Sequence, residues 1–238
     1  MRTHWRWIIL IGTILSILSA RVAGAAEPSM SKYELRLDTR ADGSGTVVLA
    51  VEADPAGEAT LTLPFPFKDC ESLSLVEGPA GAVLKAENVN AQARIVVALP
   101  PASPGTLTLR LRCDLKQALS EATPAGRFVR VSLLNTEPGS IGELSLQVTF
   151  PEGLRGHAIR EARPVAGKSE ASPRAVLDEI DGRAGVRLET LVLTQGDTAA
   201  LRVDLTSARP SPGFLVAGLL LGILYLISFR DLVDGAKK

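Results

Sequence analysis

Residues 33 to 53 read YELRLDTRADGSGTVVLAVEA, and this stretch decides the fold. Apolar and polar residues alternate in both of its arms, which is the pattern of β-strands that bury one face. Between the arms, Asp42-Gly43-Ser44-Gly45 is a cluster of residues that favours a tight turn. The stretch therefore predicts a β-hairpin near the start of an all-β fold.

Similar alternation recurs up to residue 207, interrupted by turns rich in glycine and proline. Seven short strands in about 85 residues are the size of one immunoglobulin-like, antiparallel β-sandwich. We therefore expect a first sandwich domain over residues 30–117 and a second, membrane-proximal one over 126–207. One larger sandwich with mixed strand pairing is the alternative, because the sequence shows no strict internal repeat.

The N-terminal residues 1–25 have the order of a secretory signal peptide. Two arginines precede an apolar run over residues 8–18, and small residues follow up to Ala25. As a helix this run is about 16 Å long, too short for a hydrocarbon core of about 30 Å. Cleavage after Ala25 is the favoured interpretation. The alternative is a retained anchor over residues 8–26, which would place Arg21 inside the bilayer.

A second apolar stretch lies near the C-terminus, where residues 210–229 carry no charge. Twenty helical residues are about 30 Å long, which matches a bilayer. The stretch predicts a single C-terminal transmembrane α-helix over 211–229, followed by a short cytoplasmic tail over 230–238. A buried helix of the globular part is the alternative.

With a cleaved signal, this helix predicts a single-pass cell-membrane protein whose bulk is extracytoplasmic. The sandwich region contains no N-glycosylation acceptor, so a bacterial periplasm is the default compartment.

Gly218 and Gly222 form a GxxxG pair within this stretch. Paired glycines permit close approach of two membrane helices, which predicts packing against a helix of an integral membrane protein. The alternative is that glycine is simply common in membrane helices. Only residues 208–211 separate the last expected strand from the helix, so the second domain would lie close to the lipid bilayer.

Cys70 and Cys113 are the only two cysteines of the chain. An exported chain meets an oxidising compartment, so the pair is a candidate disulfide. Closing a loop of this length stabilises the fold by about 4 kcal/mol in the chain-entropy model. Two free thiols are the alternative, whereas a redox-active pair would need a Cys-x-x-Cys spacing.

The sequence shows no set of residues that specifies a reaction. After removal of the signal, His157 is the only histidine, too few for a copper or catalytic zinc site within one chain. No nucleophile elbow and no phosphate-binding glycine motif occurs. Asp178, Glu179 and Asp181 are interpreted as a solvated face. We therefore expect no metal, no cofactor and no enzymatic activity.

Aromatic residues and charge exclude further ligand classes. Both tryptophans lie in the signal segment, which makes carbohydrate recognition an unfavoured function. Residues 26–213 hold 20 basic and 24 acidic side chains, and this acidic excess disfavours nucleic acid. Phe65 and Phe67 share one face of a proline-flanked strand, which fits either core packing or a hydrophobic edge for a partner.

Taken together, these patterns favour a non-enzymatic accessory or scaffold subunit of a larger membrane-protein complex. Its partners would be reached through the transmembrane helix and the second domain. The alternative is a stand-alone extracytoplasmic receptor or adhesion module that binds a protein or a small ligand.

Overall fold

The structure is a computed structural model, and it describes residues 29–89, 92–101, 105–122, 126–165, 174–190, 192–207, 216 and 218–225. The strands in these ranges are β1 (Ser29–Thr39), β2 (Gly45–Asp54), β3 (Thr60–Phe65), β4 (Cys70–Glu77), β5 (Val83–Val89), β6 (Gln92–Ala98), β7 (Leu107–Leu115), β8 (Ser120–Ala122), β9 (Gly126–Leu134), β10 (Ile141–Thr149), β11 (Leu154–Val165), β12 (Arg174–Ile180), β13 (Arg183–Thr190) and β14 (Thr198–Ser207).

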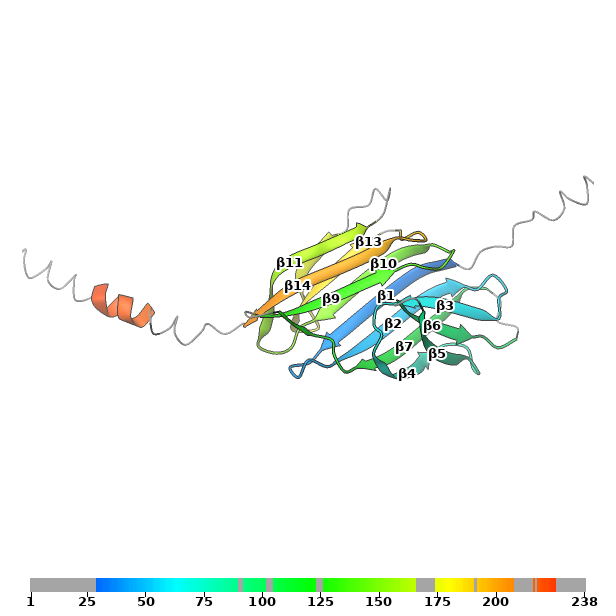
Figure 1. The fold of residues 1–238 in the computed structure, drawn as a ribbon, viewed down its shortest axis with the longest axis horizontal. Helices are drawn as coiled ribbons and strands as arrows, with labels where there is room; N and C mark the ends of the chain where they lie inside the picture. The colour runs from blue at the N-terminus through cyan, green and yellow to red at the C-terminus, as the bar shows by residue number, and fades with distance from the viewer. Residues whose placement is uncertain are drawn as a thin grey trace, which may run out of the picture.

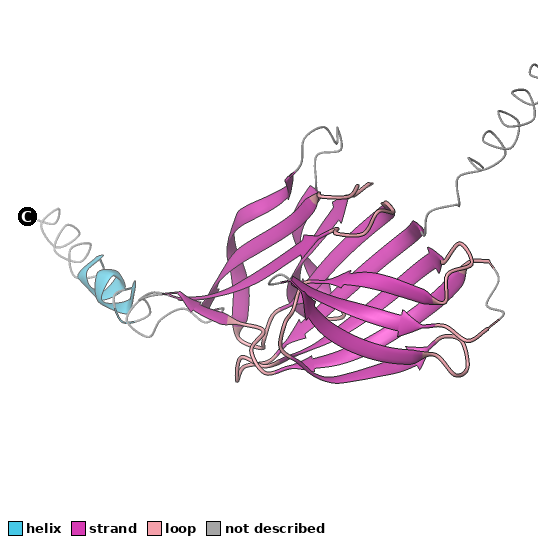
Figure 2. Cartoon of the chain, turned by 45° about the vertical axis from the view of Figure 1, so that its right-hand side comes forward, coloured by secondary structure: helices cyan, strands magenta, loops and turns pink. Residues whose placement is uncertain are grey.

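The strands form two layers. One layer is a long seven-stranded sheet in the order β12-β13-β10-β1-β2-β7-β4. The other consists of a four-stranded sheet, β11-β14-β9-β8, and a three-stranded sheet, β3-β6-β5. Figure 1 shows the two smaller sheets over different halves of the long sheet, and Figure 2 shows the same layering from a second direction.

Strand β1 lies at the centre of the long sheet. It pairs antiparallel with β2, its hairpin partner, and parallel with β10, more than 100 residues further along the chain. Leu35 is thereby opposite Leu49 on one side and Leu146 on the other. Because β1 and β10 come from the two expected domains, the long sheet crosses the expected boundary. This pairing favours the alternative of one large sandwich, although the domain division itself stays a prediction.

The alternation in β1 places its residues on the two faces of the sheet as expected. Tyr33, Leu35 and Leu37 are at most 1% exposed and face the smaller sheets, whereas Glu34 and Arg36 are partly exposed on the opposite face. Buried apolar residues from all three sheets form one continuous hydrophobic cluster. Burial of this apolar surface is the main source of the fold's stability.

The Tyr33 side chain connects the two layers. Its hydroxyl group donates a hydrogen bond of 2.6 Å to the backbone carbonyl of Pro64 in β3. The tyrosine is fully buried, and this burial raises the pKa of Tyr33 above its ordinary value. A buried phenol requires such a partner, because an unpaired polar group in the core costs free energy.

We therefore predict that Tyr33→Phe lowers the free energy of unfolding by about 1–3 kcal/mol, because the Pro64 carbonyl is left without its donor. Urea unfolding followed by circular dichroism measures the change. Val83→Ala, at a side chain that is 65% exposed, is the control and should leave the free energy nearly unchanged. A Tyr33→Phe variant as stable as the native chain would contradict this role.

Arg183 ties the start of β13 to the ends of β1 and β10. Its guanidinium group donates hydrogen bonds to the backbone carbonyls of Thr39 (2.9 Å) and Phe150 (2.6 Å) and forms an ion pair with Asp38. The turn before it, Asp181-Gly182, has positive φ angles of 51° and 76°, the geometry of a two-residue hairpin loop. The hairpin thus positions Arg183 across the parallel pair.

Two parts of the predicted fold class are wrong: the immunoglobulin-like form and the C-terminal transmembrane helix. The all-β class is confirmed, but the immunoglobulin-like form is wrong, because a sandwich of that type has two antiparallel sheets and the long sheet here contains the parallel β1–β10 pair. The predicted signal peptide (1–25) and tail (230–238) lie outside the described residues.

The predicted transmembrane helix over 211–229 is also wrong. Within that range the structure describes helical residues at 216 and 218–225. The eight residues 218–225 make a helix about 12 Å long. Within the described ranges, no helix has the length and apolar character needed to cross a bilayer. The expected single-pass cell-membrane location is overturned by the same finding. The apolar composition of this stretch indicates low polarity, but it does not determine how long a helix the stretch forms.

Candidate functional site: the outer face of the long sheet

The face of the long sheet that points away from the core carries a hollow over β2. The small side chains of Val48 and Ala50 form its floor, and longer side chains of the neighbouring strands rise on both sides. The volume of the hollow is about 300 Å³. We call it the β2 trough and define it by the residues Glu34, Arg36, Val48, Ala50, Thr108 and Arg110.

Strand register explains how the trough forms. Ala50 is opposite Glu34 on β1 and Arg110 on β7, so a short side chain lies between two long ones. Val48 is flanked in the same way by Arg36 and Arg112. Because neighbouring strands are about 4.8 Å apart, the two walls are separated by about 10 Å. This is the distance between the backbones of β1 and β7, and the side chains of the two walls narrow the space between them.

The charges along the trough are mostly paired. Lys32 contacts Glu34 at 2.8 Å, and this hydrogen bond raises the pKa of the lysine. Arg36 forms an ion pair with Asp181 in the β12–β13 turn. Arg110 is exposed and has no ion pair or hydrogen bond to any described residue. Glu77 of β4 also lines the trough and is opposite Arg110 in the strand register, but the two side chains form no ion pair, so Arg110 is available to an anionic group of a partner.

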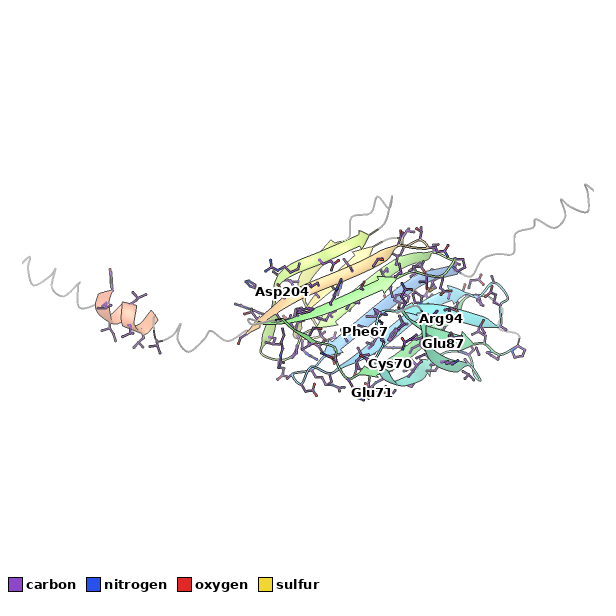
Figure 3. All side chains as sticks on the ribbon, viewed as in Figure 1. Phe67, Cys70, Glu71, Glu87, Arg94 and Asp204 are labelled. Carbon is purple, nitrogen blue, oxygen red and sulfur yellow. A yellow bond between two sulfur atoms is a disulfide. The ribbon has the colours of Figure 1, made fainter. Side chains whose placement is uncertain are left out.

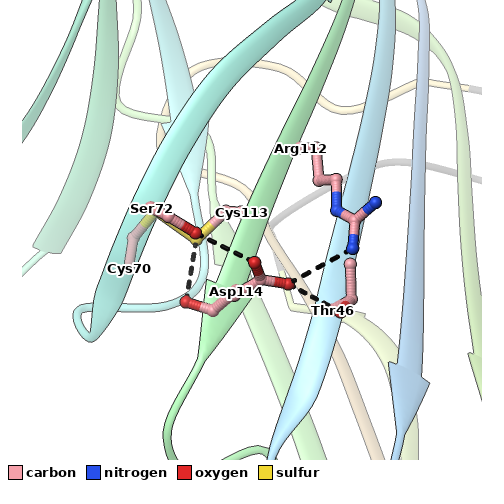
Figure 4. The surroundings of a disulfide bond; sticks show 6 residues. All are labelled: Thr46, Cys70, Ser72, Arg112, Cys113 and Asp114. Carbon is pink, nitrogen blue, oxygen red and sulfur yellow. Dashed lines mark hydrogen bonds and ion pairs between the residues drawn. A yellow bond between two sulfur atoms is a disulfide. The ribbon is translucent and has the colours of Figure 1, made fainter.

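The Cys70–Cys113 disulfide reinforces the β7 side of the long sheet. It joins β4 to β7 with a Cα–Cα distance of 5.7 Å (Figure 4). Beside it, the Asp114 carboxylate accepts hydrogen bonds from the hydroxyl groups of Thr46 (2.8 Å) and Ser72 (2.9 Å). These two bonds lower the pKa of Asp114 below its ordinary value. The carboxylate thus links β2, β7 and β4 at one end of the sheet.

We predict that the free energy of unfolding of Asp114→Asn falls less between neutral and acid pH than that of the native chain. The folded-state pKa of Asp114 is below its unfolded value, so its contribution is present above the unfolded pKa of about 4 and is lost as the pH falls through the lower, folded pKa. Urea unfolding between about pH 7 and pH 2.5 measures this difference. Asp69→Asn, at an exposed aspartate beside Cys70, is the control. Identical pH profiles for Asp114→Asn and the native chain would contradict the prediction.

Phe65 and Phe67 lie against the core. Phe65 is only 5% exposed, and Phe67 is partly buried against the same cluster. Their ring centroids are 5.7 Å apart in an edge-to-face arrangement, and Figure 3 labels Phe67 in this region. Strand β3 is an edge strand of its sheet, but the inward packing of the rings favours the core-packing alternative over a partner-binding edge.

The structure does not bring the other candidate residues from the sequence together into a site. His157 is exposed on β11, and the described residues contain no group of three or more His, Cys, Asp or Glu side chains suited to a metal ion. Apart from its chain neighbours and the backbone of its own helix, a Cβ atom added at Gly218 or Gly222 would meet no described atom within 4 Å. Their predicted role in helix packing therefore stays a prediction.

The β2 trough was not predicted from the sequence. The small outward residues Val48 and Ala50 are visible in the alternation, but the long residues that flank them are 12 to 64 residues away in the sequence. The order of strands across the sheet is therefore needed to find the trough.

Comparisons with known proteins identify no family. No family model and no curated protein matches the sequence. Among solved structures, the fold is similar to a protein from Parabacteroides distasonis described as a "putative protease", with a TM-score of 0.45 and 15% sequence identity. The match covers 76% of this chain and 41% of that chain.

Proposed function

We propose that this protein is a non-enzymatic accessory or scaffold subunit of a larger protein complex, and that a partner protein binds in the β2 trough. The observation that carries the proposal is the exposed Arg110, which lacks an ion pair among the described residues and stands beside the apolar floor of Val48 and Ala50. Apolar floors with polar rims are typical of protein interfaces, and arginine is enriched there.

The chemistry of the trough suggests what the partner presents. An extended segment with small apolar side chains would cover Val48 and Ala50, and a carboxylate on that segment would pair with Arg110. A charge-assisted pair of this kind, with two parallel hydrogen bonds, fixes orientation as well as adding affinity. The floor is part of a continuous sheet, so the trough requires little reorganisation before binding.

A small-molecule receptor is less well supported. Ligand pockets enclose most of a ligand's surface and have volumes of about 300–1,000 Å³. The trough is at the lower end of this range and lies on the outer face of a sheet. A protruding segment of a protein fits such a shape better than a molecule that must be enclosed.

The test is purification of the tagged full-length chain from its native source, followed by native mass spectrometry. Ala50→Arg fills the floor of the trough, and Arg110→Glu reverses the charge on its wall. We expect each variant to weaken binding of the stoichiometric partner by about tenfold or more, because a central interface residue contributes more than about 1.4 kcal/mol.

Arg155→Glu is the matched control, because Arg155 is an exposed arginine on β11, in a different sheet. It should retain the partner. Retention of the partner by both trough variants would contradict the proposed surface, and a native chain without any protein companion would contradict the scaffold role.

A further inference from the structure

The free edges of the three sheets differ in how well they are protected against pairing with another strand. Among the described residues, β4 and β11 each contain two register shifts, which disrupt the pairing geometry of an edge. Strand β8 has three residues, and β3 contains Pro64. Strand β5 is regular but presents Lys85, whose side chain is 74% exposed. These are features that prevent edge-to-edge association.

Strand β12 has less of this protection, because only the exposed Asp178 and Glu179 in its second half are of this kind. It pairs with β13 over seven residues without a register shift, and it contains no proline and no lysine. Val176 is 55% exposed and Leu177 is 41% exposed. Leu177 is opposite the buried Val186, so it lies on the core side of the sheet, where it adjoins Gly156 of β11, and among the described residues no strand pairs with the other edge of β12. A regular edge with exposed apolar residues in its first half is a template for another strand.

The sequence of β12 is complementary to itself in one antiparallel register. We propose that two copies of this chain pair through β12, with the two-fold axis passing between their Val176 residues. Val176 is then opposite its own copy, and Ala175 is opposite Leu177. The pairing with β13 places Ala175 and Leu177 on the core side and Val176 on the outer side, so apolar residues meet apolar residues on both faces.

The next register position supports the same axis. It places Arg174 of one copy opposite Asp178 of the other, a basic residue opposite an acidic one. A two-fold axis at Leu177 would instead place Val176 opposite Asp178 and Ala175 opposite Glu179. Apolar residues would then face carboxylates on both sides of the sheet, so the axis at Val176 is the favoured one.

The first test is the oligomeric state of the full-length chain by sedimentation velocity over a range of concentrations. We expect the native chain to be a dimer and Val176→Lys to be a folded monomer with the circular dichroism spectrum of the native chain, because two lysines would meet at the axis. Val83→Lys is the matched control, since it adds the same charge at an exposed valine on β5, and it should remain a dimer.

The second test measures the register by disulfide crosslinking. Paired residues on antiparallel strands have Cα atoms about 4.5–5.5 Å apart, within the range for a disulfide. Val176→Cys should therefore crosslink to a covalent dimer under mild oxidation, whereas Leu177→Cys should not. A monomeric native chain, a dimeric Val176→Lys variant, or crosslinking through Leu177→Cys alone would each overturn the proposal.

Discussion

The parallel ladder between β1 and β10 is the constraint on which the rest of the structure depends. Two neighbouring parallel strands need a long connection, and here β2 to β9 form that connection. The three-stranded sheet and part of the four-stranded sheet belong to this segment, so the core can close only when β10 has returned to β1. Arg183 reinforces the ladder, because its hydrogen bonds reach the ends of both strands.

The sequence predicts the strands well but not their neighbours. Alternation identifies the two faces of β1 and β2, and the turn residues after Asp38 identify their hairpin. Alternation contains no information about which distant strands are neighbours, so it does not predict the parallel β1–β10 pair or the β2–β7 pair that forms one wall of the β2 trough. At the C-terminus, low polarity predicted a transmembrane helix that the described helical residues 218–225 are too short to form.

The two proposed surfaces belong to the same sheet and have a combined consequence. A two-fold axis perpendicular to the sheet at β12 extends the long sheet into a second copy without exchanging its faces. Both β2 troughs then open on the same side of the dimer. A partner that itself has two copies of the binding segment would gain affinity through multivalency, because its second contact is intramolecular.

The most direct test of the β1–β10 ladder is hydrogen–deuterium exchange of the full-length chain, read by mass spectrometry for peptides that cover β1 and β10. The parallel ladder predicts that amides of both strands are protected to the same extent and become exchangeable together, in one cooperative opening. If the β1 peptides stayed protected while the β10 peptides exchanged, or the reverse, the two halves would open independently and the account of a single sheet would be contradicted.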